Sequence, residues 1–304
     1  MTQQIAIVGG GYIGAELAKS LDAQADVVLI EPRSHFVHAP AMIRGVVDPA
    51  VMDRALIPYD KLLTRGRVVR ARAVSVDEAG VTLEDGSRIA ADQVVVATGS
   101  GNATPFKPES DDIAAFRAES ARIHARLTAA NTVAIVGGGA VGTELACEIA
   151  HAMPDKQITL ISAPDRLFPD KPVAFGTSLA NKLERAGVRL VLGHRVENLQ
   201  SFTESYAGSL RLADEAEHDF NLIFPVLGAR ANSDLLQALP GTESSSAGRI
   251  KVDAWLRPSP SLTNVFAAGD VADAGDAMTI VATSRQLPWL KRTLLGLGAG
   301  KSID

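Results

Sequence analysis

The apolar residues of this chain gather in short runs that are separated by glycine-rich or polar segments. The clearest runs, rich in Val and Ile, lie at residues 4–8, 27–30, 94–97, 133–136 and 158–161. A run of four or five such residues between turn residues predicts a strand buried on both faces, as in a parallel sheet. Stretches 11–21 and 140–150 have helical spacing, and each connects two of these strands. The pattern therefore predicts an α/β fold built from right-handed βαβ units.

Weaker patterns predict the remaining elements. Residues 67–76 and 81–89 are expected to be two strands, with a hairpin turn at Asp85-Gly86 because Asp-Gly is a favoured turn pair. Pro288 is expected to interrupt any helix that follows Met278. Further strands are predicted at 188–192, 222–226 and 250–252, and a further helix at 173–186.

A repeat dominates the chain. AIVGGGYIGAELA at 6–18 returns at 134–146 as AIVGGGAVGTELA, with 10 of 13 positions identical. Each copy holds G-x-G-x-x-G after a predicted strand and before a predicted helix, which is the context that a dinucleotide fingerprint requires. The helix N-terminus then offers N–H groups and partial positive charge to a pyrophosphate. The candidate binding residues are Gly9, Gly10, Gly11, Tyr12, Ile13 and Gly14 in the first copy, and Gly137, Gly139, Ala140, Val141 and Gly142 in the second.

The two copies differ at the end of the next strand. Glu31, with Arg33 close behind, is placed to accept from the ribose hydroxyls of an adenosine, as in FAD or NAD. The alternative is a surface Glu at a strand end. The second copy has Ser162 and then Arg166, which do not repel a 2′-phosphate, so it is expected to take NADPH as well as NADH. The alternative for Arg166 is a side chain that points into solvent.

Composition narrows the class. The chain has 304 residues, 46% hydrophobic and 21% charged, which suffices for two ordinary domains. A net charge of −5 argues against a nucleic-acid partner. The chain contains no stretch of 18 uncharged apolar residues, so no transmembrane segment is predicted. The histidines show no metal-ligand spacing. We expect no metal and a cytoplasmic protein, with peripheral membrane contact left open.

With VVVATG at 94–99 and TNVFAAGD at 263–270, the two fingerprints resemble the two-dinucleotide-binding-domain flavoproteins of the pyridine-nucleotide oxidoreductase superfamily. The resemblance implies FAD and NAD(P)H as cofactors. It implies that Asp270 hydrogen-bonds the ribityl chain of FAD, although a helix N-cap is the ordinary alternative. Thr98 and Gly99 join the FAD site, and Gly228 is their counterpart in the NAD(P)H site.

HFVHAPAMIR at 35–44 is similar to a segment of the apoptosis-inducing-factor-2-like NAD(P)H:quinone oxidoreductases. This resemblance implies that Arg44 contacts FAD, that His38 lies near the flavin and that Ala71 offers its backbone to the adenine. Lys107 also fits, and Glu144 is implied to face the nicotinamide. Without the family, His38 is equally well a hydrogen-bonded loop histidine. Glu144 could equally be a carboxylate favoured by the helix dipole in a first turn.

The expected architecture is two Rossmann-like domains, with the NAD(P)H domain at 113–245 inserted into an FAD domain made of 1–112 and 246–304. Cys147 is the single cysteine, set among apolar neighbours typical of a buried thiol, so no redox pair can form. Electrons are therefore expected to pass from NAD(P)H through FAD directly to a quinone-type acceptor. The alternatives are a reductase of a ferredoxin-like or rubredoxin-like protein, and a low-turnover redox-signalling flavoprotein of the apoptosis-inducing-factor type.

Overall fold

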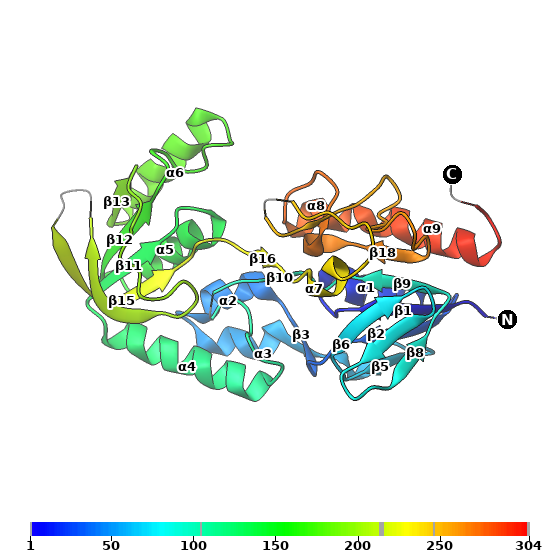
Figure 1. Ribbon diagram of the computed structural model, residues 1–304. Helices are drawn as coiled ribbons and strands as arrows, with labels where there is room; N and C mark the ends of the chain where they lie inside the picture. Colours follow the sequence, from blue (N-terminus) through cyan, green and yellow to red (C-terminus); the bar gives the residue numbers. More distant parts are fainter. Residues whose placement is uncertain (1, 104, 213–215, 246, 303–304) are drawn as a thin grey trace. The chain divides into compact units, whose positions relative to one another are not determined.

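The computed structural model describes residues 2–103, 105–212, 216–245 and 247–302 (Figure 1). The chain forms two compact units, each with its own sheet. Unit 1 contains residues 1–37, 57–101 and 230–304, and unit 2 contains residues 38–56 and 102–229. Both sheets have a parallel core with helices against it, so the predicted α/β fold with two Rossmann-like sheets is confirmed.

The sheet of unit 1 has the strand order β18-β9-β1-β2-β5, and all neighbouring pairs are parallel. Its strands are β1 (Gln4–Val8), β2 (Asp26–Ile30), β5 (Arg67–Val69), β9 (Gln93–Val96) and β18 (Val265–Ala267). Because β18 pairs with β9, the C-terminal part of the chain returns to the first sheet.

Alternate residues of these strands face two cores. Ile7 and Leu29 pack with helices α1 (Tyr12–Leu21) and α9 (Gln286–Gly298) on one face. Val8 and Ile30 pack on the other face with the antiparallel sheet β6-β7-β8. A parallel strand that is covered on both sides needs apolar side chains on both faces, and these strands have them. Pro288 lies in the first turn of α9, just after α8 (Ile280–Ser284) ends, so the predicted interruption is confirmed.

The antiparallel sheet corrects the strands predicted between residues 67 and 89. The segment forms β5 in the parallel sheet and then β6 (Ala73–Asp77), β7 (Gly80–Leu83) and β8 (Arg88–Ala90). The predicted strand 67–76 is divided at residues 70–72, because Arg67–Val69 pairs with β2 in the parallel sheet whereas Ala73–Asp77 pairs with β7. The hairpin turn at Asp85-Gly86 is confirmed, since β7 and β8 are antiparallel and Gly86 has a φ of +82°.

Unit 2 has the strand order β13-β12-β11-β15-β14, parallel except for the last pair. Its strands are β11 (Thr132–Val136), β12 (Gln157–Ser162), β13 (Val188–Leu192), β14 (Tyr206–Arg211) and β15 (Glu217–Pro225). The helices α4 (Ile113–Ala129), α5 (Ala140–Ala152) and α6 (Val173–Arg185) contribute to one core against this sheet. Residues 196–212 supply the apolar side chains of the other face.

The compact units differ from the predicted domain ranges. Residues 38–56, with α2 (Ala39–Gly45) and α3 (Met52–Ala55), belong to unit 2 because Ile43 and Val46 pack into its core. The chain changes units at 101–102 and 229–230, where β10 (Ser100–Gly101) and β16 (Arg230–Ala231) form an antiparallel pair. The predicted boundary at residues 245–246 therefore lies inside unit 1.

The remaining elements are short. They are β3 (His35–Val37), β4 (Leu56–Pro58), β17 (Ile250–Lys251), β19 (Ala272–Asp273), α7 (Asp234–Gln237) and the 3-10 turns η1 (Pro49–Val51), η2 (Tyr59–Lys61) and η3 (Gly269–Val271).

Candidate functional site

The first fingerprint turn joins β1 to α1, and two of its glycines are required by close backbone approaches. Gly9 has a φ of +101°, and a Cβ built on it would lie 2.5 Å from the carbonyl oxygen of Ala97. A Cβ on Gly14 would collide with the Gly9 carbonyl, so this glycine lets α1 pack close to the strand. Gly11 is the N-cap of α1, and a Cβ there would meet no atom within 4 Å. Open space therefore lies at a helix N-terminus whose first N–H groups favour a phosphate.

Gly10 is held from both sides by buried side chains. Its N–H donates to Oε2 of Glu31 (2.7 Å), and its carbonyl oxygen accepts from the hydroxyl of Tyr59 (2.5 Å). Glu31 is 4% exposed, so the alternative of a surface carboxylate at a strand end is wrong. Burial, and then the charge of Glu31, raises the pKa of Tyr59 well above its usual range, which keeps the hydroxyl proton as a donor. The repeat did not reveal Tyr59, which lies 49 residues from Gly10.

Arg33 is the next polar group of this site. Its backbone N–H donates to Oε1 of Glu31 (3.0 Å), and its Nη1 lies 3.5 Å from the same oxygen. Its Nε is buried and lacks a hydrogen-bond partner among the described residues. A cavity of about 290 Å³ opens beside it, lined also by Arg67 and Arg70. An orphaned donor beside a buried carboxylate fits a polar ligand that carries both donors and acceptors.

The second fingerprint turn has the same geometry. Gly137 has a φ of +130° and lies against the carbonyl of Val226, and a Cβ on Gly142 would collide with the Gly137 carbonyl. Gly139 is the N-cap of α5, with open space around a built Cβ. Ala140 and Val141, which the sequence predicts at this site, are the first two residues of α5. The chain therefore carries two turns shaped for a pyrophosphate, one in each unit.

Ser162 occupies in unit 2 the position that Glu31 has in unit 1, as equivalent hydrogen bonds in the two units show. Gly9 donates to the carbonyl of Ile30 (2.9 Å) and Gly137 to that of Ile161 (2.8 Å), so the residues that follow are equivalent. Ser162 is 5% exposed, and a Cβ on Gly138 would lie 2.6 Å from its hydroxyl. No acidic side chain therefore stands at this strand end.

Arg166 does not simply point into solvent, which was the alternative expectation. It is half-buried, and its guanidinium donates to the carbonyl oxygens of Lys171 (3.2 Å) and Pro169. These bonds close the loop that follows β12. The structure thus gives Arg166 a role in its own loop.

The strand ends near β9 carry the remaining groups of unit 1. Thr98 donates through Oγ1 to the carbonyl of Asn232 (2.6 Å), and Gly99 has a φ of +68°. Gly228 has a φ of +100° at the matching position of unit 2. Asp270 lies inside η3, whose N-cap is Ala268, so the N-cap alternative for Asp270 is wrong. Its Oδ2 accepts from the hydroxyl of Ser100 (2.6 Å).

The residues singled out on the 35–44 segment lie in unit 2. His38 is exposed at the N-cap of α2, and its N–H donates to the Ala55 carbonyl (2.9 Å). Arg44 lies 3.8 Å from Glu148 of α5, with 58% of its side chain exposed. Lys107 is half-buried in the irregular segment after β10. In unit 1, the backbone N–H of Ala71, the residue expected to contact adenine, donates to the Val69 carbonyl (3.1 Å).

Two expectations for α5 are wrong. The helix begins at Ala140, so Glu144 lies beyond the first turn, and burial followed by the charge of Glu148 raises its pKa rather than lowering it. Cys147 is exposed rather than buried, because residues 144, 147, 148 and 151 share the outer face of α5. Partial burial, and then Glu148 and Glu144, raises the pKa of the Cys147 thiol, which disfavours the nucleophilic thiolate.

Within the described ranges, no group of three or more His, Cys, Asp or Glu side chains could hold a metal ion. Among the same residues, no helix combines the length and the apolar character that crossing a membrane requires.

Comparisons with known proteins agree with the two fingerprints. Two models described as pyridine nucleotide-disulphide oxidoreductase match residues 4–54 and 59–286. Apoptosis-inducing factor homolog B of Dictyostelium discoideum is 28% identical over 326 residues, covering 99% of this chain and 83% of the relative. Ferroptosis suppressor protein 1 of Homo sapiens is 28% identical over 281 residues, covering 88% and 74%.

Solved structures share the fold. A NAD-dependent persulfide reductase from A. fulgidus superposes with a TM-score of 0.77 at 19% identity, covering 99% of this chain and 60% of that one. A putidaredoxin reductase in covalent complex with putidaredoxin gives 0.76 at 19% identity, covering 97% and 75%. The chain therefore spans less than two thirds of some of the structures that it matches.

Proposed function

Because the chain belongs to the pyridine nucleotide-disulphide oxidoreductase family, whose members bind FAD and NAD(P)H, we propose that it is an NAD(P)H:quinone oxidoreductase. The overall reaction balances as NAD(P)H + H⁺ + quinone → NAD(P)⁺ + hydroquinone. Bound FAD would supply the two-electron redox chemistry between NAD(P)H and the acceptor, and the protein would supply binding and geometry.

Unit 1 is the proposed FAD site. The pyrophosphate fits the open space at Gly11, where N–H groups of the first turn of α1 lack intrahelical acceptors. Glu31 and Arg33 stand at the adjoining strand end with an acceptor and an orphaned donor for the adenosine. Asp270 offers a carboxylate to the ribityl hydroxyls, with Ser100 holding its Oδ2.

Unit 2 is the proposed NAD(P)H site, with the pyrophosphate at Gly139. The neutral Ser162 in the place of Glu31 removes the charge that would repel a 2′-phosphate, so NADPH is accepted as well as NADH. From the family resemblance, Arg44 remains a proposed FAD contact, and His38, Lys107 and Glu144 remain proposed catalytic residues, with Glu144 facing the nicotinamide.

A quinone is proposed as acceptor because the 304 residues contain no cysteine pair that could take electrons from the flavin. An intramolecular redox disulphide needs two thiols, and this chain has only Cys147, whose pKa is raised away from thiolate formation. The observation that carries the proposal is the pair of pyrophosphate turns, one in each unit. The lone cysteine then favours a diffusible acceptor over an internal disulphide. The similarity of residues 35–44 to a segment of the apoptosis-inducing-factor-2-like NAD(P)H:quinone oxidoreductases supports the choice of a quinone.

An anaerobic titration tests the proposal. The purified protein should show a flavin absorbance spectrum, one equivalent of NADPH should bleach it, and a soluble quinone should restore it. Asp270→Ala serves as the FAD-site variant, expected to weaken FAD binding roughly ten- to a hundredfold for one lost charged hydrogen bond. A protein that takes up no FAD contradicts the cofactor assignment. Reoxidation by a ferredoxin-like protein but by no quinone would instead support the putidaredoxin-reductase type of function.

A further inference from the structure

Arg249 stands out as a buried charge that neither fingerprint explains. It is 6% exposed, and of the lysines and arginines that the structure describes it is the only buried one. It lies just before β17, which pairs with β19 through Ile250 and Ala272. A buried guanidinium is costly unless its N–H groups are satisfied, so its partners indicate what it is for.

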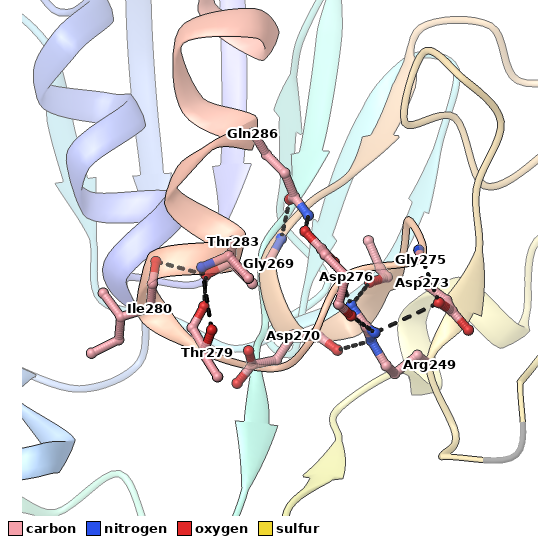
Figure 2. Close-up of polar contacts among 12 residues, drawn as sticks. Arg249, Gly269, Asp270, Asp273, Gly275, Asp276, Thr279, Ile280, Thr283 and Gln286 are labelled. Atoms are coloured by element: carbon pink, nitrogen blue, oxygen red, sulfur yellow. Dashed lines mark hydrogen bonds and ion pairs between the residues drawn. The ribbon is translucent and has the colours of Figure 1, made fainter. Parts of the chain in front are cut away.

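Among the described residues, the partners of the Arg249 guanidinium all lie on one short segment, residues 270–276 (Figure 2). Nε donates to the carbonyl oxygen of Asp270 (3.1 Å), Nη1 to that of Asp276 (2.6 Å) and Nη2 to that of Ala272. The carboxylates of Asp276 (3.1 Å) and Asp273 (3.6 Å) neutralise the charge. One rigid fork therefore ties three carbonyls of the segment together.

Gln286, 8% exposed at the start of α9, fixes the same segment from its other side. Its Oε1 accepts from the N–H of Gly269 (2.8 Å), and its Nε2 donates to Oδ2 of Asp276 (3.0 Å). Asp276 thus bridges Arg249 and Gln286. The network therefore holds the backbone of Gly269 and of Asp270, the proposed ribityl contact.

The carboxylate of Asp270 points away from the guanidinium, while its carbonyl faces it (Figure 2). The network therefore orients Asp270 without using its side chain, which Ser100 contacts instead. We propose that Arg249 is a positioning residue that presets the Asp270 segment for binding the ribityl chain of FAD. The inference rests on the proposed function. Affinity gained in this way comes from preorganisation, because a segment already in its bound conformation loses less entropy on binding.

Lysine in place of Arg249 is the sharpest perturbation. It keeps the positive charge for Asp273 and Asp276, but its three N–H groups share one nitrogen and cannot reach the three carbonyls that the three guanidinium nitrogens contact. We expect Arg249→Lys to weaken FAD binding to the apoprotein by roughly tenfold or more, the size of one lost charged hydrogen bond. The matched control is Arg257→Lys, since Arg257 is also in unit 1 but pairs with Asp253 (2.7 Å).

Three readouts separate positioning from general stability. They are the FAD dissociation constant from quenching of flavin fluorescence, the visible circular dichroism of bound flavin, and the rise in melting temperature on adding FAD. Arg249→Lys should change all three and Arg257→Lys none. If Arg249→Lys lowers the melting temperatures with and without FAD equally and leaves the dissociation constant unchanged, Arg249 is only structural and the proposal is overturned.

Asp276→Asn decides the question if Arg249→Lys does not fold. It keeps the shape but removes the charge that joins Arg249 to Gln286, and we expect FAD binding several-fold weaker than in wild type. An unchanged dissociation constant in Asp276→Asn counts against the proposal. Wild-type protein that binds no FAD would refute the proposed function itself. No effect of Asp270→Ala on FAD binding would refute the ribityl assignment, and the proposal for Arg249 with it, but not the proposed binding of FAD.

Discussion

Gly11→Ala and Gly139→Ala are matched substitutions that should separate the two nucleotide sites. Both glycines are helix N-caps with φ of −69° and −82°, values that alanine adopts without strain, and a Cβ at either position meets nothing within 4 Å. Alanine caps a helix less well than glycine, but it also reduces the entropy of the unfolded chain by about 0.4–1 kcal/mol. These effects offset each other, so the free energy of unfolding of the apoprotein should change by less than about 0.5 kcal/mol.

Nucleotide binding should respond very differently. A methyl group in the open space at Gly11 keeps a pyrophosphate from the first-turn N–H groups of α1 and removes one or two charge-assisted hydrogen bonds. At about 1.5–3 kcal/mol each, the loss corresponds to at least a tenfold weaker FAD affinity. Gly139→Ala should leave FAD retention unchanged and raise the NADPH concentration needed for half-maximal flavin reduction by a similar factor.

Urea unfolding of the apoproteins, fluorescence titration with FAD and stopped-flow reduction by NADPH measure the three quantities. Gly10→Ala is the control for packing, because its Cβ would collide with the Tyr59 hydroxyl and lie 2.9 Å from Cγ of Glu31. That variant should lose apoprotein stability as well as FAD. If Gly11→Ala binds FAD like wild type, or if Gly139→Ala loses FAD instead of NADPH affinity, the assignment of the two turns is refuted.

Three further substitutions test α5 and the second strand end. Cys147→Ser should leave quinone reduction and stability nearly unchanged, since the thiol is exposed and has no cysteine partner; lost activity with FAD still bound would mean that electrons pass through the thiol. Ser162→Glu should shift preference from NADPH toward NADH, by adding an acceptor for the ribose hydroxyls and a like charge against a 2′-phosphate; the ratio of kcat/KM values measures this, and an unchanged ratio contradicts the Ser162 assignment. Burial, and then the charge of Glu148, raises the pKa of Glu144 in the folded state, so its contribution to stability is lost as pH rises through that pKa. Glu144→Gln should therefore be more stable than wild type at neutral pH but not at acidic pH, by well under about 1 kcal/mol because the side chain is exposed. Equal melting temperatures of the two proteins at both pH values would contradict this.

Local constraints explain what the sequence by itself determined. A backbone with positive φ at Gly9 and Gly137, and contacts too close for a Cβ at Gly14 and Gly142, permit little but glycine. The spacing G-x-G-x-x-G therefore predicted both turns. Continuous apolar runs likewise predicted the buried parallel strands.

Features that depend on a helix's phase or on distant partners required the tertiary structure. The first residue of α5 decides which side faces solvent, so Cys147 is exposed and Glu144 lies past the first turn. The packing of Ile43 and Val46 into the core of unit 2 places residues 38–56 there, and no local pattern marks that choice.

The same reason hid Tyr59 and Arg249, whose partners lie 49 and 21 or more residues away. A buried hydroxyl or guanidinium is specified by the carbonyl groups that it must satisfy, and only the folded chain brings those groups together. The sequence determined where two dinucleotide turns stand, because glycine stereochemistry is local. The tertiary structure decided which side chains hold those turns and the Asp270 segment in place, because hydrogen bonds between distant residues depend on the packing of the whole unit.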